Sequence, residues 1–225
     1  RRDFYWEAKK PIPDKILWPY PHPKSVGLVM NPDELATVQK VLPDSPAASA
    51  GLRSGDSIAS FNGQPMLSTA DVQWVLHNVD PDGASVPLVV NRGGRTTNLS
   101  LSLGEGWRKK GDLSWRVSTW GLRRMAAGGL VLNVATAEEG RPKEFSPDAM
   151  ALLVRRAGKY GPHGTARRVG FREGDIIISF DGRDDLMTEQ ELLTYVATSK
   201  KHGDRVAVDV LRGDRRMSFK LPIQP

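Results

Sequence analysis

The chain has 225 residues, of which 39% are hydrophobic and 26% charged, a composition typical of a folded globular protein with one or two domains. It contains no cysteine, which excludes disulfides, cysteine nucleophiles and thiolate metal sites. No apolar run approaches the roughly 18 residues of a membrane span, so we expect no direct membrane insertion. The first residue is not methionine, and we expect the sequence to be part of a longer protein.

The formal net charge of +6 is unevenly distributed along the chain. Residues 1–24 carry +3, residues 25–103 carry −3, residues 104–124 carry +4 and residues 125–225 carry +2. A nucleic-acid-binding face combines basic side chains with aromatic ones, and only residues 107–115 offer that combination. We interpret this basic run as solvated linker charge and predict no nucleic-acid partner.

Residues 1–24 are rich in proline, which favours extended or polyproline-like backbone over helix. Trp6, Trp18 and Tyr20 give the segment apolar surface, so we expect it to pack against a domain. The alternative is a proline-rich ligand for a partner protein.

A stretch of thirteen residues occurs twice, at 51–63 as GLRSGDSIASFNG and at 170–182 as GFREGDIIISFDG. Repeats fix the number of structural units before any other argument, so the chain has two modules. In each copy a short helix ends on a glycine, and a Gly-Asp turn, an apolar β-rich run and an Asn-Gly or Asp-Gly hairpin signal follow. We predict that Gly51 and Gly170 adopt left-handed conformations at helix C-termini.

The other elements of the first module follow in order. Strands are predicted at residues 26–30 and 36–42, and Ser45-Pro46 begins a short helix. After the repeated stretch, a capping-box-like start at residues 68–71 precedes an amphipathic helix, and strands at 86–90 and 97–103 close the module.

The repeated stretch and the elements after it resemble PDZ domains, especially those of bacterial HtrA-type proteases. The resemblance implies a mainly β (α+β) fold of two PDZ-like, partly open β-barrels, each with one short and one longer helix. It also favours the periplasm or cell envelope over the cytoplasm. The predicted organisation is a proline-rich extension at 1–24, a first domain at 25–105, a linker at 106–116 and a second domain at 117–225.

Three tryptophans, Trp107, Trp115 and Trp120, lie in the connection at residues 104–124. Because tryptophan is rarely left in water, we expect them at an interface between the modules, with an aromatic ligand cage as the alternative. The second module repeats the plan with insertions at 138–145 and 159–164. At its binding loop, Gly128 stands where the family usually has a hydrophobic residue.

In the family, a peptide adds as an antiparallel strand between the strand after the binding loop and the amphipathic helix. By this resemblance the first groove comprises Val26, Gly27, Leu28, Met30, Thr69, Gln73 and Leu76, and the second comprises Gly129, Leu130, Leu132, Glu189, Leu193 and Val196. Leu76 and Val196 are alternatively simple core residues. We predict that a C-terminal peptide with an apolar last residue prefers the first groove, because Gly128 removes part of the second pocket floor and Glu189 disfavours an acidic peptide. The proline-rich start enters directly ahead of the first loop and is placed to cover that groove.

No catalytic site is predicted. The four histidines are isolated, and neither a G-x-S-x-G nucleophile turn nor a phosphate-binding loop is present, so we expect no catalytic residue, cofactor or metal in this segment. The leading hypothesis is a non-catalytic tandem PDZ adaptor that recognises protein C-termini or extended segments. The alternatives are a substrate-presenting regulatory region of a larger enzyme such as an HtrA-type serine protease, and purely structural modules whose grooves the chain itself fills.

Overall fold

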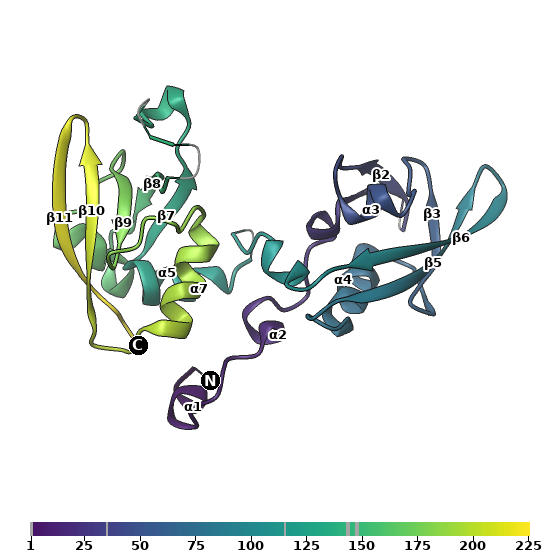
Figure 1. Ribbon diagram of the computed structural model, residues 1–225, viewed down its shortest axis with the longest axis horizontal. Helices are drawn as coiled ribbons and strands as arrows, with labels where there is room; N and C mark the ends of the chain where they lie inside the picture. The colour runs from purple at the N-terminus through teal and green to yellow at the C-terminus, as the bar shows by residue number, and fades with distance from the viewer. Residues whose placement is uncertain (1, 35, 115, 143–144, 147–148) are drawn as a thin grey trace. The chain divides into compact units, whose positions relative to one another are not determined.

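The computed structural model describes residues 2–34, 36–114, 116–142, 145–146 and 149–225. The chain divides into two compact units, Ile12–Asp112 and Leu113–Pro225, the latter grouped with Arg1–Pro11 (Figure 1). Each unit contains one copy of the repeated stretch. About 31% of the chain is strand and 28% helix, arranged in open sheets, which confirms the prediction of two open PDZ-type β modules with helices.

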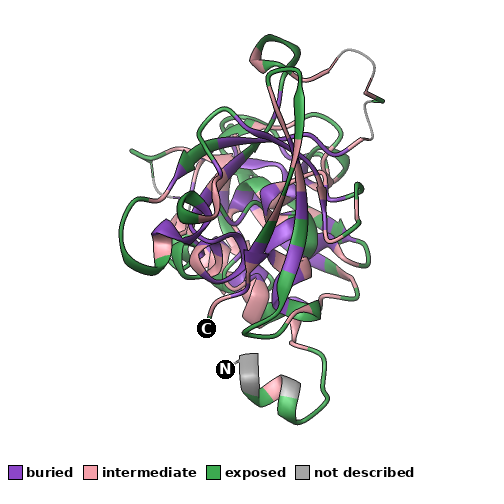
Figure 2. Ribbon diagram, turned by 90° about the vertical axis from the view of Figure 1, so that its left-hand side faces the viewer, coloured by how far each residue is buried: buried purple, intermediate pink, exposed green. Residues whose placement is uncertain are grey.

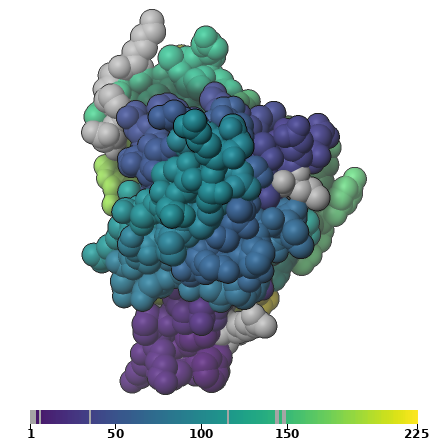
Figure 3. All heavy atoms as spheres, turned by 90° about the vertical axis from the view of Figure 1, so that its right-hand side faces the viewer, coloured from purple at the N-terminus to yellow at the C-terminus, as the bar shows by residue number. Residues whose placement is uncertain are grey.

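The unit Ile12–Asp112 contains a four-stranded antiparallel sheet and a separate two-stranded one. The larger sheet has the order β4-β3-β5-β6, and β1 pairs with β2. The teal atoms of the β5–β6 region lie near the middle of the face seen in Figure 3. The elements are α2 (Asp14–Leu17), η1 (Pro23–Val26), β1 (Leu28–Met30), β2 (Val38–Val41), α3 (Pro46–Ser49), β3 (Ser57–Phe61), β4 (Gln64–Pro65), α4 (Thr69–Asn78), β5 (Ala84–Arg92), β6 (Arg95–Leu103) and η2 (Trp107–Lys110).

The unit Leu113–Pro225 is built on one five-stranded antiparallel sheet of order β11-β10-β9-β8-β7, with β7 at its edge. Buried and exposed residues alternate along β10, as expected when one face of a strand lines a core (Figure 2). The elements are α5 (Thr119–Ala127), β7 (Leu130–Val134), η3 (Ala137–Glu139), β8 (Leu152–Ala157), η4 (Gly161–Gly164), α6 (Thr165–Val169), β9 (Ile176–Phe180), α7 (Glu189–Ser199), β10 (Arg205–Arg212) and β11 (Arg215–Pro222).

The aspartate of each repeated stretch is held by an arginine at the end of a closing strand. The buried Asp56 carboxylate accepts two hydrogen bonds from Arg92, at 2.7 and 2.8 Å, and Arg92 also donates to the Gly51 carbonyl at 2.8 Å. Asp175 and Arg212 repeat this arrangement with distances of 2.7 and 2.9 Å. The clamp ties the Gly-Asp turn to the last hairpin of each unit, which explains why both residues recur with the repeat.

The sequence predicts that Gly51 and Gly170 adopt left-handed conformations at helix C-termini. Gly51 follows α3 with φ +79°, as predicted, whereas Gly170 at the end of α6 has positive φ (+122°, ψ 0°) but lies outside the left-handed helical region. The prediction of extended backbone throughout residues 1–24 is wrong, because α1 (Arg2–Glu7) and α2 are helical. The helix α1 precedes the first proline, and Pro13 is the N-cap of α2, where a proline interrupts no helical hydrogen bond. Trp18 is buried, as the packing prediction requires, and the Trp6 side chain lies outside those described.

Trp107 belongs to the hydrophobic core of the first unit, and its indole N–H donates to the Asp80 carbonyl at 2.9 Å. The prediction that it lies at an interface between modules is therefore wrong, since the core of one unit already buries it. Trp115 lies outside the described residues. Trp120 is half exposed and belongs to α5, a helix that the sequence analysis does not predict.

Candidate functional site: two grooves between an edge strand and a helix

In the first unit, β1 pairs with β2 along one edge, with Leu28 opposite Val41 and Met30 opposite Val38. On the helix side, α4 starts at a capping box in which the Asp71 carboxylate accepts the N–H groups of Leu67 and Ser68. These bonds hold the pKa of Asp71 below its usual value, with the bond from Leu67 as the largest cause.

The predicted residues of the first groove differ in their burial. Leu28 and Leu76 are fully buried and belong to one hydrophobic cluster, with Met30 packed at its margin. Thr69 and Gln73 are half-buried on α4. The strand side and the helix side of the groove thus share a core, and Leu76 has the packing expected of a core residue as well.

The predicted binding loop of the first unit comprises the η1 turn and Gly27. Gly27 has φ +89°, and a Cβ at this position would lie 2.0 Å from Ser45 Oγ, so only glycine fits against the start of α3. The Gly27 N–H donates to the Lys24 carbonyl at 3.0 Å. In this state the Gly27 amide is therefore used in a hydrogen bond within the loop.

The segment before the loop lies along α4. The Tyr20 N–H donates to His77 Nδ1 at 3.2 Å, and the Gln73 amide donates to the Tyr20 carbonyl at 3.4 Å. The rings of Tyr20 and His77 stack with centroids 4.2 Å apart. One residue predicted to line the groove, Gln73, thus already contacts the main chain of the N-terminal segment.

Arg108 holds this segment against the end of α4. Its guanidinium donates to the Leu76, His77 and Val79 carbonyls at 3.0, 2.9 and 2.8 Å, and to the Trp18 carbonyl at 3.2 Å. A cation at a helix C-terminus is favoured by the unpaired carbonyls and the helix dipole. Burial lowers the pKa of Arg108 below its usual value. The interpretation of Arg108 as solvated linker charge is therefore wrong, because its side chain is buried and bonded to carbonyls at the end of α4 and in the N-terminal segment.

In the second unit, the predicted groove residues lie on or beside β7, the edge strand, and on α7. Gly129 has φ +89°, and a Cβ there would lie 1.9 Å from the His163 carbonyl oxygen. Gly128 has φ +61° and caps the C-terminus of α5. The departure from the family pattern at this position thus follows from α5, which needs a residue able to adopt positive φ at its end. The predicted apolar residues of this groove are all buried: Leu130, Leu132, Leu193 and Val196.

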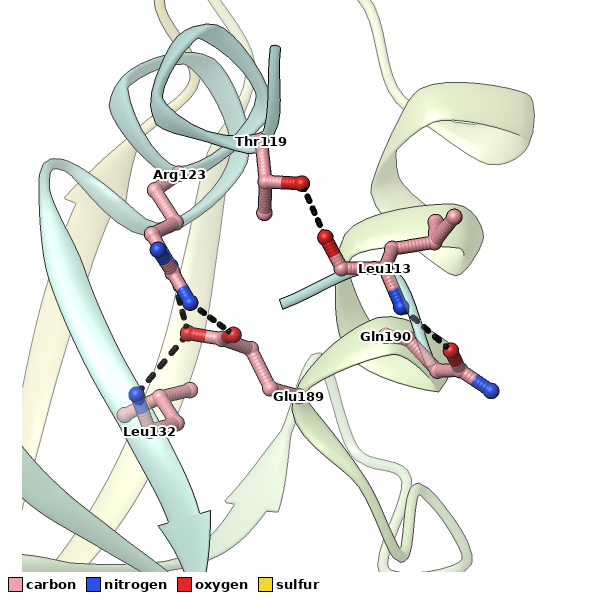
Figure 4. Close-up of polar contacts among 6 residues, drawn as sticks. All are labelled: Leu113, Thr119, Arg123, Leu132, Glu189 and Gln190. Atoms are coloured by element: carbon pink, nitrogen blue, oxygen red, sulfur yellow. Dashed lines mark hydrogen bonds and ion pairs between the residues drawn. The ribbon is translucent and has the colours of Figure 1, made fainter. Parts of the chain in front are cut away.

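Glu189 connects three elements of the second unit (Figure 4). Its carboxylate accepts two hydrogen bonds from Arg123 of α5, at 2.9 and 2.6 Å, and a third from the Leu132 N–H of β7 at 2.9 Å. The side chains of Arg123 and Glu189 are only 6% and 7% exposed. Glu189 is thus paired and buried, whereas the sequence analysis treats it as an unpaired acidic group facing a peptide.

The segment before α5 covers the first turn of α7. The Leu113 N–H donates to the Gln190 side chain at 3.2 Å, and the Thr119 hydroxyl donates to the Leu113 carbonyl (Figure 4). Together with Arg123, these contacts place Leu113 and α5 against the N-terminal end of α7. No sequence pattern signals this, because the two contacts with α7, Leu113 to Gln190 and Arg123 to Glu189, each join residues more than sixty positions apart.

The part of the chain that the structure describes contains no group of three or more His, Asp or Glu residues that could hold a metal ion. Among the same residues, no helix has the length and apolar character needed to cross a membrane. His22 caps η1 by accepting the Lys24 N–H, and burial lowers the pKa of its imidazole.

Comparisons with known proteins agree with this architecture. The family model for the PDZ domain matches residues 25–103 and 161–223. Similar relatives include the "Probable periplasmic serine endoprotease DegP-like" of Pseudomonas savastanoi pv. phaseolicola, 31% identical over 83% of this chain and 37% of its own length. The protein of the same name from Pseudomonas putida (strain W619) is 29% identical over 83% of this chain and 38% of its own length. The chain therefore spans less than two fifths of these relatives.

Two solved structures are also similar over part of the chain. The serine endoprotease from Yersinia pestis is 32% identical, with a TM-score of 0.29, over 31% of this chain and 25% of that one. The HtrA3 PDZ domain bound to a phage-derived ligand (FGRWV) is 24% identical, with a TM-score of 0.30, over 34% of this chain and 81% of that one. The two family-model matches fall one in each unit, and the chain belongs to the PDZ domain family.

Proposed function

We propose that the first PDZ domain binds extended or C-terminal peptides by addition of a strand to β1. The observation that carries this proposal is the position of β1. This strand pairs with β2 on one side, and its residue Leu28 belongs to the same hydrophobic cluster as Leu76 of α4. Strand addition derives affinity from main-chain hydrogen bonds and selectivity from side-chain pockets. The groove comprises Val26, Gly27, Leu28, Met30, Thr69, Gln73 and Leu76.

The ligand in this proposal ends in an apolar side chain. Met30, half-buried at the margin of the core that contains Leu28 and Leu76, supplies apolar surface, and burial of such surface contributes about 25 cal/mol per Å². The contacts of Tyr20 with Gln73 and His77 support a competition in which residues 18–23 occupy part of the helix wall until a peptide displaces them.

The experiment is calorimetric titration of the full chain with a pentapeptide that ends in valine. Met30→Asp places a charge at the margin of the groove, and we expect affinity to fall about tenfold or more. Leu99→Asp is the matched control, because Leu99 also packs at the margin of the same core but lies on β6. Equal affinities for the two variants would refute the groove assignment.

We further infer that the parent protein is a periplasmic HtrA-type serine protease whose PDZ domains present substrates to a catalytic domain outside this sequence. The names of the DegP-like relatives and their match over 83% of this chain support this inference. The competing function is an adaptor without a protease. The complete gene distinguishes the two, since a serine protease domain encoded in the same reading frame is expected only for the first.

A further inference from the structure

The ion pair of Arg123 and Glu189 is a feature of the second PDZ domain alone. Glu189 is the first residue of α7, and the residue at the start of α4 in the first domain is Thr69, which carries no charge. Arg123 belongs to α5, whereas η1 precedes the binding loop of the first domain. The repeated PDZ plan therefore does not account for this pair.

The binding loop of the second domain uses its own amides. The N–H groups of Gly128 and Gly129 both donate to the Arg123 carbonyl, the latter at 2.9 Å, where they cap α5. Neither amide is directed at a ligand in this state. An anionic group that enters this groove must therefore find its donors elsewhere.

Three donors converge elsewhere in the groove, on the carboxylate of Glu189. Nε and Nη2 of Arg123 lie 2.9 Å from Oε1 and 2.6 Å from Oε2 of Glu189, and the Leu132 N–H donates a third bond to Oε1 at 2.9 Å. A paired guanidinium fork is the geometry that recognises carboxylates. Arg123 also lies over the Trp120 ring, 5.1 Å from its centroid, which further fixes the guanidinium. The donors come from α5 and β7, and only the carboxylate comes from α7.

These donors lie beside the open edge of the sheet, where a PDZ domain accepts a peptide strand. Leu132 lies on the edge strand of the sheet, and its N–H is used by Glu189, so the carboxylate takes a hydrogen bond that a peptide strand added to β7 could accept. The surrounding side chains of Leu130, Leu193 and Val196 are buried and apolar. An arginine in such surroundings strongly favours an anionic partner, because an unpaired buried charge is costly.

We propose that Arg123 and the Leu132 N–H form a carboxylate-binding site of the second PDZ domain, and that Glu189 is its resident occupant. A peptide carboxylate binds there only when the Glu189 side chain leaves. The ligand is an extended peptide that contributes either its terminal carboxylate or an Asp or Glu side chain. This site is separate from the first groove, and its test does not depend on peptide binding there.

The test uses the full chain carrying Glu189→Ala, with sodium acetate as the first probe. We expect acetate to raise the melting temperature of this variant by more than sodium chloride does at equal ionic strength, and to leave the wild type unchanged. Glu191→Ala is the matched control, since Glu191 lies on the same helix turn but caps its N-terminus in solvent. It is expected to lose stability without any specific response to acetate. The double variant Arg123→Ala/Glu189→Ala is expected to show no such response either.

The second probe is a set of pentapeptides: a free acid, its C-terminal amide, and an amide with one internal glutamate. Binding is monitored by the NMR amide signal of Leu132 in Glu189→Ala, and in Glu189→Gln if the alanine variant does not fold. We expect at least one carboxylate-bearing peptide to bind about tenfold more tightly than the plain amide, and the one that does so identifies the source of the carboxylate. Equal binding of all three peptides, or an acetate response that survives in the double variant, would overturn the proposal.

Discussion

Arg123 and Glu189 lie 66 residues apart in sequence and are joined by hydrogen bonds of 2.9 and 2.6 Å, with both side chains almost fully buried. Arg183 and Asp185 form a pair of similar length, at 2.8 and 2.6 Å, with side chains that are 42% and 62% exposed. Because water screens the second pair and not the first, similar geometry should give unequal contributions to stability.

Removal of one partner from the buried pair should therefore be severe. We expect Arg123→Ala to lower the free energy of unfolding of the second domain by about 3–5 kcal/mol, since Glu189 is left buried without its cation. Arg183→Ala, the control, should cost much less, because its pair is exposed to water. Urea denaturation followed by circular dichroism measures both values. Similar losses for the two variants would show that burial does not separate the pairs.

The clamp in the first domain should make its stability depend on pH. The hydrogen bonds from Arg92 hold the pKa of Asp56 below its ordinary value. A carboxyl group with a depressed pKa contributes stability above its unfolded pKa of about 4, and this contribution is lost as the pH falls through the folded pKa. The Asp56→Asn variant should therefore be less stable at neutral pH and should lose less stability on acidification than the wild type.

Melting temperatures measured between about pH 2 and pH 7 test this expectation, because that range spans the pKa of a carboxyl group in the unfolded chain. Asp82→Asn provides the control, because Asp82 is exposed in the loop before β5. That variant should keep the acid-dependent loss of the wild type. If Asp56→Asn loses as much stability on acidification as the wild type, the Asp56–Arg92 pair does not cause the pH dependence.

The two repeat glycines allow a paired comparison. A Cβ at Gly51 would meet no heavy atom within 4 Å, so Gly51→Ala causes no steric clash with other residues. It should lower the free energy of unfolding by about 1 kcal/mol, because alanine is strained at positive φ. At Gly170 the Cβ would lie 2.9 Å from Phe219 Cε1, so Gly170→Ala adds a steric term and should cost more. Denaturation of the two variants gives the difference directly. The expectation is wrong if Gly51→Ala is the more damaging change.

The sequence was sufficient to predict the two modules, because the glycines, the aspartate and the hairpin signals that build each turn are local and occur twice. It was not sufficient to predict α5, since residues 119–127 include Gly121 and no strong cap, and the helix gains its contacts from α7 and β7. Arg108 and Glu189 were misread for the same reason. Their partners are backbone and side-chain groups brought close only by the fold, so a basic run and a helix-start glutamate resembled solvated charges.

The segment before the first groove should compete with ligand. Tyr20→Ala removes the ring that stacks on His77, and we expect the affinity of the full chain for a valine-ending peptide to rise a few-fold. Tyr160→Ala is a suitable control, because Tyr160 is 82% exposed in the other unit. Calorimetry of both variants measures the change. Unchanged or weaker binding by Tyr20→Ala would show that the segment does not restrict the groove.

Peptides are expected to bind the first groove in preference to the second, where Glu189 already accepts the hydrogen bonds of Arg123 and of the Leu132 N–H of β7. Amide NMR signals of the full chain, followed during titration with a valine-ending free-acid peptide, test this claim most directly. We predict that the signals of Leu28–Met30 and of Thr69, Gln73 and Leu76 shift first and saturate at the lowest peptide concentration. Earlier saturation of the signals of Leu130–Val134 would contradict the account.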